Sequence, residues 1–116
     1  MKQRDRDMLD HIIRYCDRIS GYINGLSDGW NSFESDQMCQ DACCMCIAQI
    51  GELSGHLTDE FKKAHPDIPW REIKDTRNLY VHNYGGIDLT FVWNTMKKDL
   101  PELKLKCQNY LAEEQI

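Results

Sequence analysis

The sequence predicts an all-α fold, an up-and-down bundle of four to five helices. Apolar residues recur at spacings of three and four along most of the chain. The prolines and the Gly85–Gly86 pair fall between these stretches, and no stretch alternates apolar with polar residues as a half-buried strand would. We expect one domain over residues 1–116, since a single hydrophobic core typically takes about 100–150 residues.

The first helix is expected over residues 3–24, where one face carries apolar residues: Leu9, Ile12, Cys16, Ile19 and Ile23. Gly25 suits the C-terminal cap, and residues 26–34 are predicted to form a loop. A second helix follows over 35–57, with Ser32 or Ser35 as its N-cap. Its apolar seam alternates steps of four and three, which is typical of helix bundles, and comprises Cys39, Cys43, Cys46, Ile50, Leu53 and Leu57.

The second half of the chain predicts shorter helices. Thr58 begins a short helix that Pro66 ends, and Pro69 opens a third long helix that runs through His82 to the Gly85–Gly86 pair. Asp88 is the expected cap of a fourth helix over 89–99. Pro101 is expected to start a separate last helix over 101–114.

Charge is unevenly distributed along the chain. There are 14 Lys and Arg against 19 Asp and Glu, and residues 26–60 hold seven acids with no Lys or Arg. That middle stretch would repel a polyanion unless it faces away from it. No stretch approaches the roughly 20 uncharged apolar residues of a membrane span, and no apolar secretion signal opens the chain. We therefore expect a cytoplasmic protein with no membrane partner.

Six cysteines need an explanation, four of them clustered between Cys39 and Cys46. A zinc site is one interpretation, but the paired knuckles of closed zinc sites are missing. Cys39, Cys43 and Cys46 share a helix face with Ile50, which favours core packing. We expect reduced cysteines in the core and no metal.

The segment that carries reactive groups contains Arg77, His82 and Tyr84. A guanidinium can hold a phosphate with two hydrogen bonds, and an imidazole can move a proton near neutral pH. With the 2′-hydroxyl of RNA as nucleophile, these two groups suffice for metal-free RNA cleavage. By spacing alone the alternative remains open that Arg77 pairs with Asp75, Glu52 or Asp36 and that His82 caps a helix.

The spacing Arg77, four residues, His82, one residue, Tyr84 resembles the defining motif of HepT-like toxins of the HEPN superfamily. Other parts of that family pattern occur along residues 8–105. They include Ile50-Gly51-Glu52, Pro66-Asp67-Ile68-Pro69-Trp70, Val92-Trp93 and Leu100-Pro101-Glu102-Leu103. The resemblance implies a HEPN-like helical bundle.

The resemblance also implies a metal-independent endoribonuclease toxin of a prokaryotic toxin–antitoxin pair, without a cofactor. Arg77 and His82 would be catalytic, and Asp36, Asn78 and Asn83 would support them. An MntA-like nucleotidyltransferase antitoxin would transfer AMP onto Tyr84, placing negative charge beside the catalytic pair. Members are expected to form homodimers that bind RNA in a composite cleft. The alternative is a non-catalytic helical module that binds the nucleotidyltransferase and serves as its acceptor.

Overall fold

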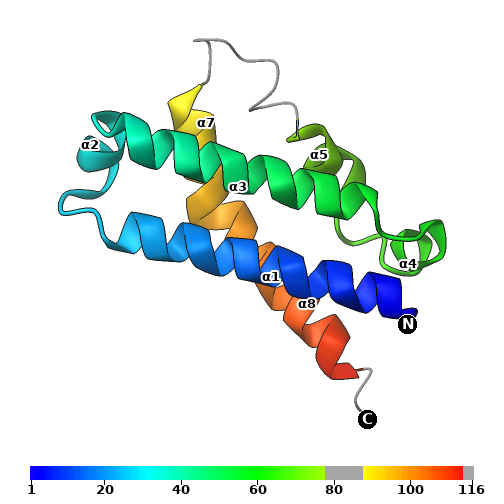
Figure 1. Cartoon of the computed structure of the whole chain (residues 1–116). Helices are drawn as coiled ribbons and strands as arrows, with labels where there is room; N and C mark the ends of the chain where they lie inside the picture. Colours follow the sequence, from blue (N-terminus) through cyan, green and yellow to red (C-terminus); the bar gives the residue numbers. More distant parts are fainter. Residues whose placement is uncertain (78–87, 114–116) are drawn as a thin grey trace.

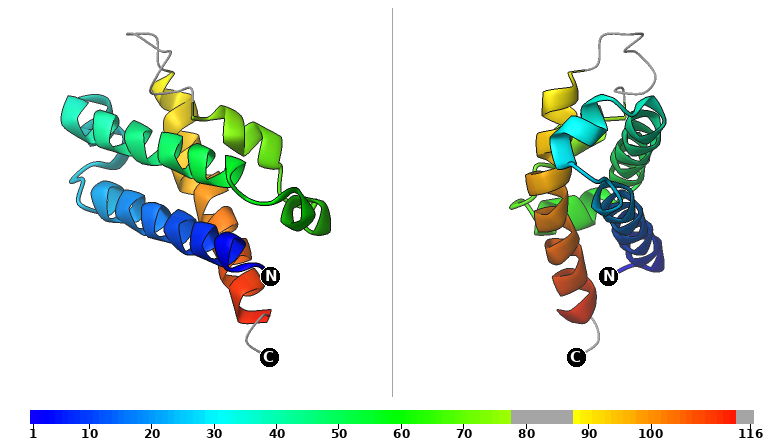
Figure 2. Two further views of the ribbon diagram at one scale, coloured as in Figure 1. Left: turned by 45° about the vertical axis from the view of Figure 1, so that its right-hand side comes forward. Right: turned by 90° about the vertical axis from the view of Figure 1, so that its left-hand side faces the viewer.

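The computed structural model describes residues 1–77 and 88–113, and regular structure in these ranges is entirely helical. The predicted all-α class is confirmed. Helix α1 (Gln3–Asn24) and helix α3 (Gln37–Gly55) lie side by side and run in opposite directions (Figure 1). A third rod crosses this pair steeply (Figure 2) and is built from α7 (Leu89–Asn94), η1 (Thr95–Asp99) and α8 (Leu100–Glu113). The third rod thus departs from a strictly parallel up-and-down arrangement.

Helix α1 has the predicted bounds, and its predicted apolar face is buried except at Ile23, which is half-buried. The loop prediction for residues 26–34 is wrong, because helix α2 occupies Gly29–Glu34. Phe33 of α2 is fully buried and packs on Trp30 and Trp93, with ring centroids 6.2 and 5.2 Å away. This aromatic packing across the fold stabilises six residues whose local composition suggests a loop.

Helix α3 is capped by Asp36, which accepts a hydrogen bond from the backbone nitrogen of Cys39 at 2.9 Å. The prediction of Ser32 or Ser35 as this cap is wrong. Ser35 instead donates to the carbonyl oxygens of Asn31 and Ser32 within the preceding turn. The buried Gln40 amide donates to the carbonyls of Phe33 and Glu34, both at 2.9 Å, and so ties α2 to α3.

The cysteines pack in the core as predicted. All six are free, five are buried, and only Cys39 is half-buried. Burial raises the pKa of Cys44 to about 11 and that of Cys16 and Cys107 to about 12, so these thiols stay protonated. Among residues 1–77 and 88–113, no group of three or more His, Cys, Asp or Glu side chains could hold a metal ion.

Helix α4 (Asp59–Ala64) follows Thr58, its N-cap, close to the predicted start, and is anchored to the start of α1. The buried carboxylate of Asp5 accepts hydrogen bonds from the backbone nitrogen and hydroxyl of Thr58, at 2.8 and 2.6 Å. The Thr58 hydroxyl in turn accepts from the Phe61 nitrogen at 3.1 Å. The chain then turns through the prolines into helix α5 (Trp70–Asp75).

The last two predicted helices are one continuous rod. Helix α7 (Leu89–Asn94), capped by Asp88 as predicted, runs into a π-helical turn, η1 (Thr95–Asp99), and then into α8 (Leu100–Glu113). The prediction that Pro101 starts a separate helix is wrong. The π turn lies directly before Pro101, and the Leu100 nitrogen donates to the Thr95 carbonyl five residues back. This wider turn absorbs the proline without breaking the rod.

The helices bury one continuous apolar core. It comprises the inner faces of α1, α3 and the α7–η1–α8 rod, closed at its ends by Phe33, Phe61 and Trp70. No helix in the described part of the chain is long and apolar enough to cross a membrane.

Candidate functional site

Arg77 lies just after the C-terminal end of α5. Helix α5 ends at Asp75, and Thr76 and Arg77 form a turn, with the Arg77 nitrogen donating to the Lys74 carbonyl at 3.3 Å. The prediction of one uninterrupted helix from Pro69 through His82 is therefore wrong at Thr76. The physical reason is local: the Thr76 hydroxyl donates to the Ile73 carbonyl at 2.6 Å, which competes with continued helix bonding.

The turn that carries Arg77 is pressed against α3 at Gly51. A side-chain carbon at position 51 would lie only 2.7 Å from the Arg77 backbone nitrogen and from the Ile73 carbonyl oxygen. It would also lie 2.8 Å from the Thr76 hydroxyl, which contacts the Ile47 carbonyl of α3 at 3.4 Å. Only glycine permits this approach, so residue 51 determines where the Arg77 backbone sits.

The Arg77 side chain is exposed, and no described carboxylate neutralises it. Within residues 1–77 and 88–113, neither a hydrogen bond nor an ion pair joins it to Asp36, Glu52 or Asp75. Glu52 instead contacts His56, with its Oε1 atom 3.1 Å from Nε2. A guanidinium in this state is available to an external anion such as a phosphate.

Asp36 is not beside the Arg77 turn. It precedes Gly51 by 15 residues along α3, which corresponds to about 22 Å of helix. Its side chain caps α3 instead of orienting Arg77. The other predicted site residues, Asn78, His82, Asn83 and Tyr84, lie outside the described residues.

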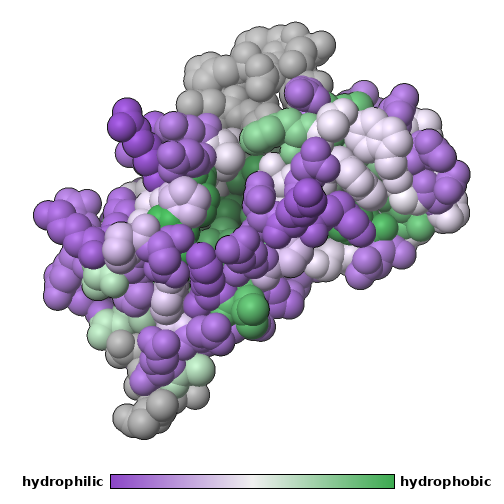
Figure 3. Space-filling model, turned by 180° about the vertical axis from the view of Figure 1, so that it is seen from behind, coloured by the Kyte–Doolittle hydropathy of each residue, from purple (hydrophilic) through white to green (hydrophobic). Residues whose placement is uncertain are grey.

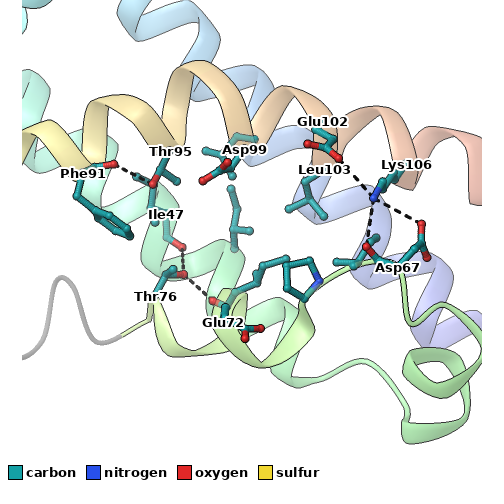
Figure 4. A pocket seen from close by; sticks show the side chains of 15 residues that line it. Ile47, Asp67, Glu72, Thr76, Phe91, Thr95, Asp99, Glu102, Leu103 and Lys106 are labelled. Carbon is teal, nitrogen blue, oxygen red and sulfur yellow. Dashed lines mark hydrogen bonds and ion pairs between the residues drawn. The ribbon is translucent and has the colours of Figure 1, made fainter.

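A groove beside the Arg77 turn is a feature that the sequence analysis missed. It has a volume of about 370 Å³ and runs between α3, α5 and the α7–η1–α8 rod. Seen from behind, the surface has an apolar hollow with hydrophilic rims (Figure 3). Thr76 and Glu72 line one side, and Phe91, Thr95 and Asp99 line the other (Figure 4). No local motif signals it, because its walls come from three separate parts of the chain.

One end of the groove is closed by a polar cluster. The Tyr110 hydroxyl donates to both carboxylate oxygens of Asp67, at 2.8 and 3.0 Å, which lowers the pKa of Asp67. The Lys106 ammonium lies 3.5 Å from both Asp67 and Glu102 (Figure 4). This cluster links the segment before α5 to α8.

Comparison with known proteins identifies the family. The family described as "Ribonuclease HepT-like" matches residues 12–110 of this chain. The chain belongs to the HepT-like ribonuclease family. The predicted class of enzyme, a ribonuclease, is confirmed by this membership.

Individual relatives agree with the family. A probable ribonuclease HepT of Thermococcus cleftensis is 34% identical over 91% of this chain and 94% of its own length. A putative RNase of Caldanaerobacter subterraneus is 30% identical over 94% of this chain and 96% of its own length. A Methanocaldococcus jannaschii protein described as a gamma-glutamylcyclotransferase and putative RNase is 32% identical, and its match covers 97% of this chain but 50% of that protein. No solved structure gives a significant match.

Proposed function

We propose that this HepT-like protein is a metal-independent endoribonuclease toxin in which Arg77 and His82 cleave RNA. The observation that carries the proposal is the Arg77 turn: an exposed guanidinium, unpaired among the described residues, on a backbone that Gly51 holds against α3. Membership of a ribonuclease family supports RNA cleavage as the reaction. An imidazole can move the protons of that reaction, and a guanidinium can stabilise the charge on the phosphate.

In the proposed reaction, the 2′-oxygen of a ribose bonds to the adjacent phosphorus, and the bond from phosphorus to the 5′-oxygen breaks. The proton of the 2′-hydroxyl is removed and one is returned to the 5′-oxygen. His82 moves a proton at one of these oxygens, and Arg77 binds the phosphate oxygens as negative charge develops on them. The products are a 2′,3′-cyclic phosphate and a 5′-hydroxyl.

The proposed regulation acts on the same site. A nucleotidyltransferase antitoxin transfers AMP onto Tyr84, two residues after His82. The added phosphate would compete with RNA for Arg77 and repel the RNA backbone. Asn78 and Asn83 are proposed to contact the substrate near this pair, and the active form is proposed to be a homodimer.

The test of catalysis is RNA cleavage in EDTA by the purified protein. We expect His82→Ala and Arg77→Ala each to lower the rate by about 100-fold or more, the size typical of a lost acid–base or transition-state contact. His11→Ala is the matched control, because His11 is exposed on α1 and is expected to leave the rate unchanged. Product ends are identified by mass spectrometry.

Two results would contradict the proposal. One is full activity in folded His82→Ala protein, and the other is intact RNA with wild-type protein under all conditions. The second result, together with AMP transfer to Tyr84 and tight binding of the nucleotidyltransferase, would favour the non-catalytic acceptor module.

A further inference from the structure

The groove beside α5 has an apolar floor that is continuous with the core. Its floor side chains come from α3, from the segment before α5, and from α8, and each is at most 6% exposed: Ile47, Ile50, Ile68, Leu100 and Leu103. Phe91 stands at one edge and is 50% exposed. Pro69 is also exposed and Ile73 is half-buried, so the accessible apolar surface of the groove lies along its edges. That surface gains free energy when another apolar surface covers it.

The groove is long and narrow. Along the α7–η1–α8 rod its lining runs from Phe91 to Lys106, a span of 15 residues or about 22 Å. About 370 Å³ spread over that length accommodates a single row of side chains. The shape therefore fits a helix that places one face into the groove better than it fits a compact small molecule.

The rim of the groove is acidic. Among residues 1–77 and 88–113, four carboxylates line it, from Asp67, Glu72, Asp99 and Glu102, against the single ammonium of Lys106. Lys106 is already shared between Asp67 and Glu102 at one end. Glu72 and Asp99 stand on opposite walls (Figure 4), and neither forms an ion pair or hydrogen bond within the described residues.

The charge of the rim determines whether the groove favours an anionic or a cationic ligand. Four carboxylates against one committed ammonium repel the phosphates of RNA, so the groove is unsuited to the substrate. They attract an occupant with cations on both flanks of an apolar face. Asp99 also ends the π-helical turn η1, and such turns are frequent at functional sites.

We propose that this groove binds a basic amphipathic helix of a partner protein. Its apolar residues cover Pro69, Ile73 and Phe91. Its Lys or Arg side chains pair with Glu72 on one wall and Asp99 on the other. Among the described residues, the last one of the α5 wall is Thr76, directly before Arg77. The partner is thereby brought next to the proposed catalytic turn without occupying it.

The test is a binding measurement on the full chain that does not depend on RNA cleavage. The probe is a fluorescent helical peptide of about 15 residues, the length that spans the groove, made of Leu, Ala and Lys with Leu at positions three and four apart. A second peptide replaces every Lys with Glu. We expect the Lys peptide to bind, to weaken as salt increases, and to bind at least about tenfold better than the Glu peptide.

Paired variants locate the binding. Glu72→Gln combined with Asp99→Asn is expected to weaken the Lys peptide about tenfold. Asp10→Asn combined with Glu34→Gln removes the same charge from exposed positions outside the groove and is expected to change binding less than twofold. Phe91→Ser, at the apolar edge, is expected to weaken binding with little effect on its salt dependence.

Several outcomes would overturn the proposal. These are no binding of the Lys peptide, equal binding of the Glu peptide, or equal losses in the two double variants, which would indicate attraction to the net acidic surface alone. Displacement of the peptide by an RNA oligonucleotide of similar length would also overturn it, because the groove would then be a nucleic-acid surface. RNA cleavage by Glu72→Gln with Asp99→Asn is measured in parallel and is expected to remain, which separates this proposal from the nuclease.

Discussion

At residue 51 the backbone of a neighbouring segment excludes a side chain. The missing Cβ of Gly51 would lie 2.7 Å from two backbone atoms that cannot move independently of α5. We expect Gly51→Ala to lower the free energy of unfolding by about 1–3 kcal/mol through overpacking. It should also slow RNA cleavage under conditions where the variant is folded, because Arg77 is displaced. Urea unfolding and cleavage rates measure the two effects.

Gly55 supplies the matched control on the same helix. A Cβ there would lie 3.5–3.6 Å from methylene carbons of Lys74, an ordinary contact with a flexible side chain. Gly55→Ala is expected to leave cleavage unchanged and to stabilise the protein by up to about 1 kcal/mol through helix propensity. Equal stability and activity in the two variants would show that α5 is free to shift away from α3.

The Asp67–Tyr110 pair gives the protein a pH-dependent contact. Hydrogen bonds from Tyr110 lower the pKa of Asp67 in the folded protein below its unfolded value of about 3.9. The contribution to stability is therefore present above pH ~4 and is lost as the pH falls through the lower folded pKa. We expect Tyr110→Phe to lower the urea midpoint at pH 7 and to lower it less near pH 3.

Tyr15→Phe serves as the control for this pH experiment. The Tyr15 hydroxyl has no hydrogen-bond partner within the described part of the chain, although Arg18 lies over its ring. The effect of Tyr15→Phe on the urea midpoint should be small and the same at pH 7 and near pH 3. A Tyr110→Phe effect that is independent of pH would show that Asp67 does not provide the pH-dependent contact.

At the scale of elements, hydrophobic periodicity predicted the helices that pack by one face. The Leu9–Ile12–Cys16–Ile19 face placed α1 at its observed bounds, and Asp88 was correctly identified as the cap of α7. The errors arose where long-range packing overrides local composition. Trp93, about 60 residues away, stabilises α2, and the π turn before Pro101 depends on its position within a continuous rod.

The catalytic roles of Arg77 and His82 stay a prediction from residue type and spacing, and the structure adds where the Arg77 turn lies. The spacing of Arg77 and His82 indicated their chemistry, yet nothing in the sequence showed that the helix stops before Arg77. The contact of Gly51 with the Arg77 turn and the acidic groove both join residues from different helices. Local patterns do not encode such contacts.

The burial of the cysteines along α3 predicts which thiol reacts first with an alkylating reagent. Burial raises the pKa of all four thiols of α3, but Cys43, Cys44 and Cys46 are buried, whereas Cys39 near the helix start is half-buried and therefore more accessible. We expect iodoacetamide at pH 8 to modify Cys39 first in native protein and all six cysteines in urea. Mass spectrometry locates the adducts. Cys39→Ser should leave the native protein almost unmodified, and rapid modification of several thiols would contradict the buried arrangement.

At the scale of the whole molecule, urea unfolding tests both the proposed homodimer and the predicted single domain over residues 1–116. Trp30 and Trp93 report on the α2–α7 end of the core, and Trp70 reports on the region around α4 and α5. If the chain is one cooperative unit, tryptophan fluorescence and helical circular dichroism should follow the same urea transition. If folding is coupled to dimerisation, the midpoint should rise with protein concentration, because association stabilises the folded state by mass action.

The expected result is a coincident transition whose midpoint rises over a 100-fold range of protein concentration, about 1 to 100 μM. Sedimentation at the upper end should then give about twice the 13.6 kDa mass of one chain. A midpoint that is independent of concentration, with a monomer mass, would remove the composite RNA cleft from the proposal. Arg77 and His82 would then have to bind RNA within a single chain, and the −5 net charge would leave that chain dependent on a few local cations for RNA affinity.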